Sequence, residues 1–206
     1  MITDIHTHTP RPDAIAVVDD PSELPHGCLG SIAIHPWKTD SADMESILEH
    51  ISVKASDPRI VAIGETGLDT LRGAPMNIQQ KIMAHHIALS ESLRKPLIIH
   101  SVRTHHLIAA MHRRYCPAQP WIIHGFRGNP ATARMLTDRG IFLSFGERFN
   151  PLTPVSVPHD LLMLETDTSP LTIEEIAENV AVATHYLNFQ QLLDISAVNI
   201  SRTVLR

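Results

Sequence analysis

The chain has 206 residues, of which 43% are apolar and 19% charged, and its formal net charge at pH 7 is −5. This size and composition fit one globular domain, expected over residues 1–206. No run approaches the roughly 18 apolar residues of a membrane helix, and the polar N-terminus does not fit a signal peptide. We therefore expect a cytoplasmic protein with no membrane partner and no evident obligate protein partner. The net negative charge gives no global indication of nucleic-acid binding.

Eight short apolar runs bounded by turn residues predict buried parallel strands. In chain order they cover residues 2–5, 14–18, 31–34, 60–63, 96–99, 121–123, 141–144 and 161–164. Helical patterns occupy most of the gaps after the third run. They are expected over 42–53, in the segment carrying Ile78 to Leu93, over 102–114, from Asn129 to Gly140, and from the Thr172 capping box through Leu187.

Strands that alternate with helices predict a TIM-type (β/α)8 barrel. The chain is short for that fold, whose usual size is about 250 residues. The deficit lies in the first third, because about two dozen residues separate the first and third strands, too few for two crossover helices. We expect this third to be shortened, and either distorted or partly open. A doubly wound α/β sheet is the alternative.

Imidazole and carboxylate side chains recur where the predicted strands end. They are His6, His8, Glu65, His100, His124 and Asp167. In parallel α/β folds the carboxyl ends of the strands carry the ligand site, and His with Asp or Glu binds divalent metals. Alternate residues of a strand share a face, so His6 and His8 can converge on one ion.

These candidates exceed the four positions of one tetrahedral zinc ion, so two divalent metal ions (Zn, Mg or Mn) fit better. Glu65 is the acid available to bridge them. A two-metal centre deprotonates a water and polarises the electrophile, and it needs a carboxylate base beside that water. We assign Asp167 as this base. His35, which also ends a strand, is expected to play a structural or substrate-wall role, and the helical histidines, such as His86, are expected on the surface or in the core.

The motifs that carry these residues resemble TatD-family metal-dependent hydrolases. They are DIHTH at 4–8, IHPW at 34–37, GETGLD at 64–69, IIH at 98–100, IHGFRG at 123–128 and LETDTSP at 164–170. The resemblance implies an amidohydrolase-like TIM barrel with a divalent metal centre and phosphodiester hydrolysis, usually of DNA. It also implies one metal held by His6, His8, Glu65 and Asp167, a second held by Glu65, His100 and His124, and a supporting role for Asp4.

The chain departs from the family pattern after the TDTSP motif. Family members usually continue through a loop with an arginine and an asparagine-proline pair, whereas here the helix at Thr172 follows at once. The substrate is expected to be a phosphoester, possibly DNA. Arg103, Arg127 and Arg148 follow the fifth, sixth and seventh strands and are candidate phosphate contacts, because guanidinium binds phosphate by two hydrogen bonds.

Two other functions remain open from the sequence. One is an amidohydrolase-type enzyme that cleaves a small cyclic amide, lactone or ester on the same metal centre. Its common version bridges the metals with a carbamylated lysine, and Glu65 occupies that place here. The other is a metal-binding scaffold without catalysis, which the retention of Asp167 disfavours.

Overall fold

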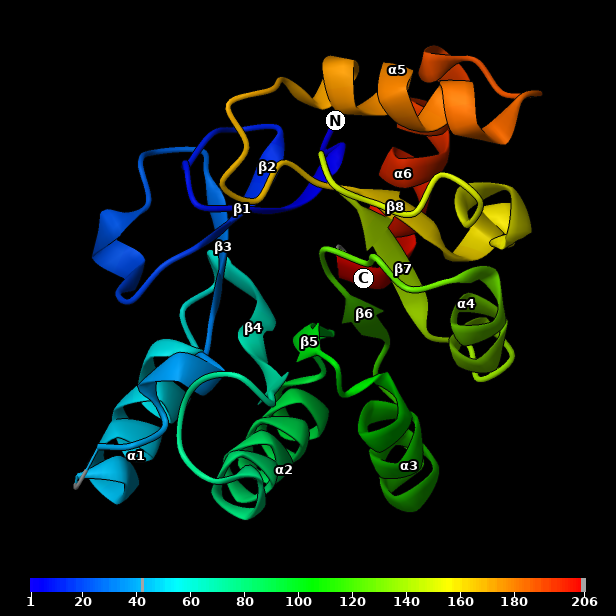
Figure 1. Cartoon of the computed structure of the whole chain (residues 1–206). Helices are drawn as coiled ribbons and strands as arrows, with labels where there is room; N and C mark the ends of the chain where they lie inside the picture. Colours follow the sequence, from blue (N-terminus) through cyan, green and yellow to red (C-terminus); the bar gives the residue numbers. More distant parts are fainter. Residues whose placement is uncertain (42, 205–206) are drawn as a thin grey trace.

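The computed structural model describes residues 1–41 and 43–204 and folds them around a closed parallel barrel (Figure 1). The strands follow the sequence order around the barrel: β1 (Asp4–Thr7), β2 (Ala14–Val17), β3 (Leu29–Ile32), β4 (Ile60–Asp69), β5 (Leu97–Val102), β6 (Trp121–Ile123), β7 (Phe142–Phe145) and β8 (Leu162–Leu164). Pairing of Asp4 with Leu164 joins β1 to β8 and completes the ring. The predicted TIM-type barrel is confirmed, and the doubly wound sheet is wrong.

The first third of the barrel is shortened but not open. Residues 8–28, all of which the structure describes, connect the first three strands through β2, loops and the 3-10 helix η1 (Pro21–Glu23). Both β1 and β3 still pair with β2 in parallel, and β3 pairs with β4. Of the two alternatives for this third, the partly open barrel is therefore wrong. Loops can close this part because each strand needs only hydrogen bonds to its neighbouring strands. A helix on the outer face is not required for that pairing.

Within the described residues, six α-helices cover the rest of the barrel. They are α1 (Met44–Lys54), α2 (Met76–Leu93), α3 (His105–Tyr115), α4 (Pro130–Thr137), α5 (Ile173–Thr184) and α6 (Phe189–Val204). The predicted start of the first helix at residue 42 lies outside the described residues. Helix α6 was not expected from the sequence, and the helix expected through Leu187 ends earlier, at Thr184, because His185 adopts a left-handed conformation. Among the described helices, none is long and apolar enough to cross a membrane.

A separate apolar cluster fills the interior of the barrel at one end. It takes residues from seven of the eight strands, together with two from α6: Ile5, Ile15, Ala62, Ile98, Ile122, Phe142, Met163, Ile200 and Val204. Side chains from so many strands of a closed ring can meet only inside it. Ile200 is fully buried. Thus α6 closes one end of the barrel, and polar side chains are left to occupy the other.

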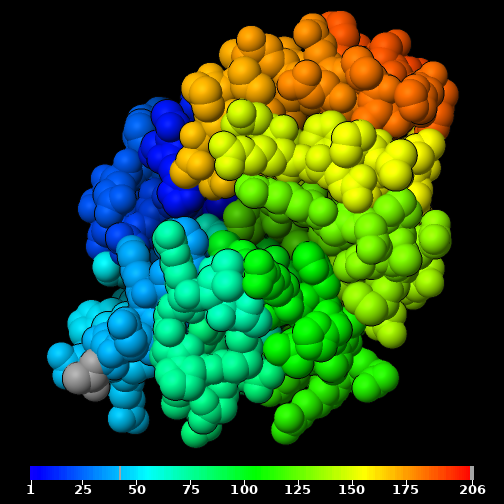
Figure 2. All heavy atoms as spheres, viewed as in Figure 1, coloured from blue at the N-terminus to red at the C-terminus, as the bar shows by residue number. Residues whose placement is uncertain are grey.

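The alternation of the strands places the polar residues directly above this cluster. His100 lies two positions after Ile98, His124 two positions after Ile122, and residues i and i+2 of a strand face the same side. Their side chains therefore enter the barrel at its carboxyl end. Figure 2 shows that the face in view is hollowed between the N-terminal part of the chain (blue) and the middle part (green).

Candidate metal centre

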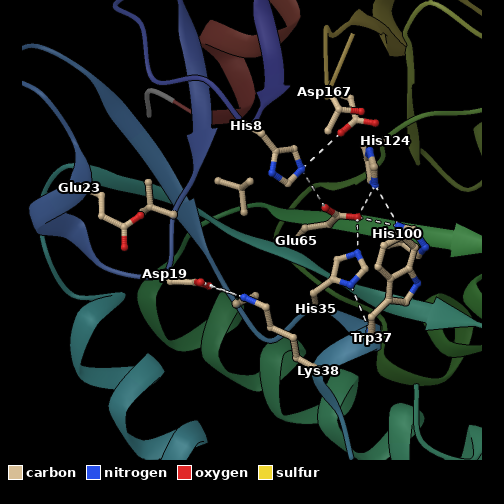
Figure 3. Close-up of a pocket in the computed structure, with 14 residues that line it drawn as sticks. His8, Asp19, Glu23, His35, Trp37, Lys38, Glu65, His100, His124 and Asp167 are labelled. Atoms are coloured by element: carbon tan, nitrogen blue, oxygen red, sulfur yellow. Dashed lines mark hydrogen bonds and ion pairs between the residues drawn. The ribbon is translucent and has the colours of Figure 1, made fainter. Parts of the chain in front are cut away.

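Glu65, on β4, is the meeting point of the predicted ligands (Figure 3). Its Oε1 accepts hydrogen bonds from His100 Nδ1 at 2.7 Å, from His124 Nε2 at 2.7 Å and from His35 Nε2 at 3.0 Å. Its Oε2 faces the other way, 3.4 Å from His6 Nε2. One buried carboxylate thus contacts imidazoles on both of its sides, which is the arrangement a bridging ligand requires.

A glycine allows β4 to bring Glu65 this close to β5. Gly67 has a φ of +150°, and a Cβ at this position would lie 2.0 Å from the carbonyl oxygen of His100. No side chain fits into that space. The Gly-Glu-Thr-Gly sequence therefore lets the strand that carries Glu65 pack closely against the strand that carries His100.

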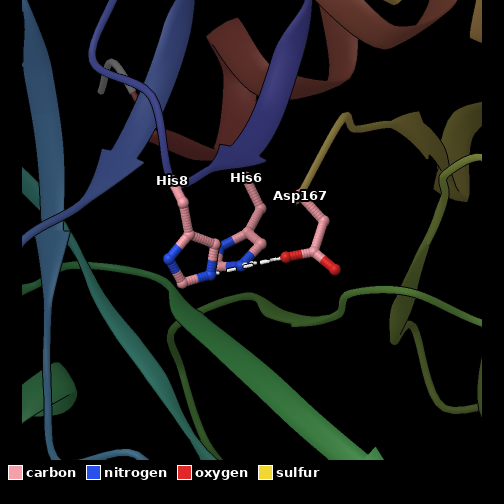
Figure 4. A group of neighbouring side chains, drawn as sticks. All are labelled: His6, His8 and Asp167. Atoms are coloured by element: carbon pink, nitrogen blue, oxygen red, sulfur yellow. Dashed lines mark ion pairs between the residues drawn. The ribbon is translucent and has the colours of Figure 1, made fainter. Parts of the chain in front are cut away.

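His6, His8 and Asp167 form the other half of the cluster (Figure 4). The Oδ1 atom of Asp167 lies 3.4 Å from His8 Nε2 and 3.7 Å from His6 Nε2. Backbone hydrogen bonds fix this turn against β1, because Asp167 N–H donates to His6 O and His8 N–H donates to Asp167 O. Asp167 also has a left-handed φ of 52°, an uncommon conformation for a non-glycine residue that is often found at functional sites.

The cluster has the donor set of a divalent metal site. Among the described residues, four groups offer ligand atoms within 4.8 Å of one another: His6–His8–Asp167, His6–Glu65–His124, His35–Glu65–His100 and His124–Glu165–Asp167. Both ring nitrogens of His6 are buried without a hydrogen-bond partner. A buried imidazole without a partner is costly, and a bound cation would remove that cost. Imidazole nitrogens and carboxylate oxygens fit zinc and also manganese or magnesium.

Glu65 and His124 each stabilise the charged form of the other. Burial alone would raise the pKa of Glu65, but the charge of His124 and hydrogen bonds from the surrounding histidines hold it well below its usual value. Burial would lower the pKa of His124, but the carboxylates of Glu65 and Glu165 raise it well above its usual value. Without metal, a proton on His124 therefore neutralises part of the negative charge, and a metal cation would displace it.

His8 and Asp167 likewise stabilise each other's charged forms. The hydrogen bond to Asp167 raises the pKa of His8 despite partial burial. Burial would raise the pKa of Asp167, but the hydrogen bond from His8 and the nearby His6 lower it. Asp167 is thus a carboxylate at neutral pH. Its side chain is 32% exposed, so it can contact both water and a bound ligand.

A family model described as TatD related DNase matches residues 4–203. The chain belongs to the TatD family. The family expected from the sequence, and with it the class of metal-dependent hydrolase, is therefore confirmed.

Individual TatD-family relatives agree with this assignment. The uncharacterized metal-dependent hydrolase YabD of Bacillus subtilis is 29% identical over 195 residues, which cover 84% of this chain and 75% of that protein. The 3'-5' ssDNA/RNA exonuclease TatD of Cronobacter turicensis is 28% identical over 166 residues, or 75% of this chain and 62% of that protein. The match thus spans less than two thirds of that exonuclease. The crystal structure of YJJV, a TatD homolog from Escherichia coli K12, has the same fold, with a TM-score of 0.84 at 17% identity over 100% of this chain and 98% of that one.

The TatD motifs also bring a supporting carboxylate to β1, as expected. Asp4 is buried, and its Oδ1 accepts the backbone N–H of His6 at 3.1 Å. Its Oδ2 accepts the hydroxyl of Thr166 at 2.7 Å and pairs with the guanidinium of Arg11. Burial raises the pKa of Asp4 to about 6, although Thr166 and Arg11 oppose this. Asp4 contacts the backbone of a candidate ligand, which fits the supporting role that the resemblance implied.

Two further acids were not assigned from the sequence. Glu165 is fully buried, its Oε1 accepts the N–H of Gly125 at 2.7 Å, and it lies 3.3 Å from His124 Nδ1. Asp69 Oδ2 accepts Trp37 Nε1–H at 2.6 Å and lies 3.3 Å from His100 Nε2. A carboxylate on the far nitrogen fixes the orientation of a metal-binding imidazole. The same-face rule could have found Glu165, since it lies two positions after the interior residue Met163.

His86, expected on the surface or in the core, lies in the core. Its side chain is fully buried on α2, and its Nε2 accepts the N–H of Ile34 at 3.1 Å. Its Nδ1 donates to Ile82 O at 2.9 Å and lies 3.2 Å from Thr66 Oγ1. Burial lowers the pKa of His86 to about 3, so the ring is neutral. It ties α2 to the residues next to His35 and Glu65.

Two cavities adjoin the cluster, and Asp167 and Thr168 line both. The first, of about 560 Å³, contains His8, His35, Glu65, His100 and His124 at one side (Figure 3). The second, of about 420 Å³, is lined by Arg127 and Arg148 among others. The third predicted phosphate contact, Arg103, lines neither cavity and has a left-handed φ of 58° after β5.

Proposed function

We propose that this chain is a two-metal phosphodiesterase that cleaves nucleic acid, with single-stranded DNA as its first candidate substrate. The observation that carries the proposal is the position of Glu65, whose two oxygens face separate sets of imidazoles. Such a carboxylate can hold two ions close together. The relative from Cronobacter turicensis is named as an ssDNA/RNA exonuclease, which supports the choice of substrate.

In this proposal His6, His8, Glu65 and Asp167 hold one metal, while Glu65, His100 and His124 hold the other. The distances within each set favour this division. His35 reaches the same oxygen of Glu65 and is an additional candidate for the second site. We leave the ions as zinc, manganese or magnesium, since the donor set accepts all three.

The reaction follows from these positions. Two bound divalent ions would polarise the phosphate, acidify the attacking water and stabilise the leaving oxygen. Asp167 accepts the proton of that water, because its lowered pKa keeps it ionised and its side chain reaches solvent. His8 holds the Asp167 carboxylate in place from one side, and the backbone bonds to β1 hold the turn.

Arg127 and Arg148 are the proposed contacts of the substrate phosphates. Both side chains are exposed, and both line the cavity that begins at Asp167. Guanidinium groups in this cavity supply local positive charge for phosphate, although the chain as a whole has a net charge of −5. Arg103, outside both cavities, is a weaker candidate for the same role.

An amidohydrolase-type reaction on a cyclic amide, lactone or ester is the second candidate, and the site disfavours its common form. That form uses a carbamylated lysine as the metal bridge, whereas a glutamate stands here. The lysine that lines the adjoining cavity, Lys38, donates to both oxygens of Asp19 at 2.9 Å. It is therefore engaged away from the cluster.

A substrate panel tests the proposal. The purified protein, stripped of metal and reloaded separately with magnesium, manganese or zinc, is incubated with single-stranded DNA, double-stranded DNA, single-stranded RNA, and a cyclic amide and lactone. We expect cleavage of the single-stranded nucleic acids and none of the amide or lactone. Hydrolysis of the amide or lactone without nuclease activity, at full metal occupancy, would replace the proposal with the second candidate.

A further inference from the structure

Outside the metal cluster that they share, the walls of the two cavities carry opposite net charges, and this asymmetry bears on how a nucleic-acid strand is placed. Both cavities contain Asp167 and Thr168, so a strand bound across the reacting phosphate would extend into both. The part of the strand that each cavity receives depends on the charge of its walls, and the inference rests on the proposed nuclease function.

The smaller cavity favours a phosphate chain. Arg127 and Arg148 line it, and neither forms an ion pair or side-chain hydrogen bond with any residue that the structure describes. Three acids also line this cavity: Glu165 and Asp167, which belong to the metal cluster, and the exposed Glu147. Outside the cluster, two unpaired guanidinium groups exceed the one carboxylate of Glu147, so this part of the wall retains positive charge for successive phosphates.

The larger cavity is apolar at its base and negative at its outer wall. Val17, Val18 and Ala33 provide the apolar surface. Glu23 lies on the side opposite the Glu65 cluster (Figure 3), and its carboxylate has no hydrogen bond or ion pair within the described chain. A free carboxylate on this wall disfavours a second negative group.

The cation of the larger cavity does not offset Glu23. Lys38 is bound through both oxygens of Asp19, so this pair is neutral as a unit. Trp37 is also fixed in place: its indole N–H donates to Asp69 Oδ2 at 2.6 Å, and the guanidinium of Arg72 lies 4.3 Å from its ring centroid. Outside the metal cluster, the cavity therefore presents aromatic and apolar walls with one uncompensated negative charge, that of Glu23.

We propose that the larger cavity receives the terminal nucleoside of the strand and selects an end without a terminal phosphate, with Glu23 as the specificity-determining residue. The phosphate chain then runs along Arg127 and Arg148. A cavity of about 560 Å³ lies within the usual range for small-molecule sites and suits one nucleoside rather than a polymer. A nucleoside with a free hydroxyl is neutral, whereas a terminal phosphate would bring roughly −1.5 to −2 charges toward Glu23.

The test compares matched single-stranded oligonucleotides whose 3' and 5' ends carry either a hydroxyl or a phosphate. We expect a phosphate at the end that enters the larger cavity to lower kcat/KM roughly tenfold at low salt, in line with a few charge-charge contacts near a protein surface, and to matter less at high salt. Glu23→Gln should reduce the discrimination to about twofold. Glu49→Gln, an exposed acid on α1, serves as the control and should retain the full discrimination.

Equal rates for phosphate- and hydroxyl-ended strands at both ends would overturn the inference while leaving the nuclease proposal intact. Discrimination that persists unchanged in Glu23→Gln would overturn the assignment to Glu23. Absence of cleavage of every oligonucleotide under all three metals would contradict the proposed function itself, and the inference would fall with it.

Discussion

Glu65 connects the two halves of the candidate centre at the scale of single residues. It receives three imidazole hydrogen bonds on one oxygen and faces His6 with the other, so its removal separates groups that are otherwise within reach of each other. Asp167 is the second decisive residue. It combines a lowered pKa, partial exposure and a fixed backbone, which are the properties of a base beside a bound water.

Substitution of Asp167 by asparagine should abolish most of the activity. The amide keeps the size of the side chain but cannot take a proton, so we expect kcat to fall by roughly 10²–10⁴-fold, the usual contribution of a general base. The measurement is steady-state cleavage of a single-stranded oligonucleotide at saturating metal. Asp194→Asn, on the exposed side of α6, is the matched control and should behave like the unchanged protein. Full activity in Asp167→Asn would contradict the assignment.

The buried His86 makes the stability of the protein dependent on pH. The pKa of His86 in the folded protein is about 3, against an ordinary value of 6.5. Between these two pH values the imidazole is therefore protonated in the unfolded chain and neutral in the folded protein. The contribution is fully present above pH 6.5 and is lost at about 1.4 kcal/mol per pH unit as the pH falls toward 3. Urea denaturation at several pH values should therefore give a shallower loss for His86→Gln than for the unchanged protein.

His106→Gln is the control for this series, since His106 is exposed on α3. Its stability should follow the same pH dependence as that of the unchanged protein. Parallel curves for all three proteins would show that His86 does not remain neutral in the folded state.

The sequence was sufficient to predict that the six candidate side chains meet at the strand ends, and their role as metal ligands stays a prediction. HxH at β1 and single acids or histidines after apolar runs are local signals, and the structure brings all six candidates together. The carboxylates that contact the far ring nitrogens of two of these histidines were harder to predict. Glu165 and Asp69 stand within motifs that were recognised, but their contacts to His124 and His100 depend on the packing of other strands. The same-face rule could have placed Glu165 inside the barrel, but no local pattern encodes the contact of Asp69 with His100.

At the scale of elements, α6 determines where the site can form. Its buried residues close the amino end of the barrel, and two of its polar side chains tie it to the strands. Ser196 Oγ donates to Thr3 O at 2.8 Å and accepts Leu164 N–H at 3.0 Å. Asn199 Nδ2 donates to Leu162 O at 2.7 Å. With one end closed in this way, the carboxyl end is the opening that remains.

Truncation of the side chain that closes the barrel should be costly. Ile200 is fully buried in the interior cluster, so Ile200→Ala should lower the free energy of unfolding by roughly 2–5 kcal/mol through lost burial and a cavity. Val198, on the same helix, is 62% exposed, and Val198→Ala should change it by less than about 0.5 kcal/mol. Chemical denaturation measures both. Equal effects would show that α6 does not close the barrel as described.

The limits of prediction at this scale have a physical cause. Strand positions were recovered to within a few residues because short apolar runs are distinctive, but β4 continues through Gly64 to Asp69, where the glycines and polar residues masked the strand. Helix α6 has the required buried face, yet its segment mixes asparagine, serine and threonine with the apolar residues. Two of those polar residues, Ser196 and Asn199, bind backbone groups in β8 or next to β1, a tertiary use that the pattern alone does not reveal.

At the scale of the whole molecule, the closed barrel is a rigid frame for a charged interior. Nearly all of the proposed ligands are buried or half-buried, so the folded metal-free protein confines several carboxylates and imidazoles within one cavity. The shortened first third does not weaken this frame, because β1 and β3 keep their pairing with β2. Metal binding should therefore act on the stability of the entire domain.

Metal should raise the melting temperature. A ligand present at one hundred times its Kd stabilises the folded state by about 2.7 kcal/mol, which for a chain of this size corresponds to a rise of roughly 5–10 °C. Differential scanning calorimetry of the chelator-treated protein, with and without added manganese or zinc, measures the shift. His100→Ala, which removes one proposed ligand of the second site, should reduce it. An unchanged melting temperature at saturating metal would contradict a metal site formed by the fold.

The proposed function depends most on the sharing of Glu65 by two ions, and a metal titration addresses this sharing directly. Increasing equivalents of manganese are added to chelator-treated protein at a concentration well above its Kd for the metal. Cleavage of a single-stranded oligonucleotide is measured at each step, both for the unchanged protein and for Glu65→Gln. We predict activity that rises until two equivalents are bound, and a loss of at least about 10²-fold in Glu65→Gln at every ratio. Full activity at one equivalent, or a Glu65→Gln protein as active as the unchanged one, would contradict a shared carboxylate.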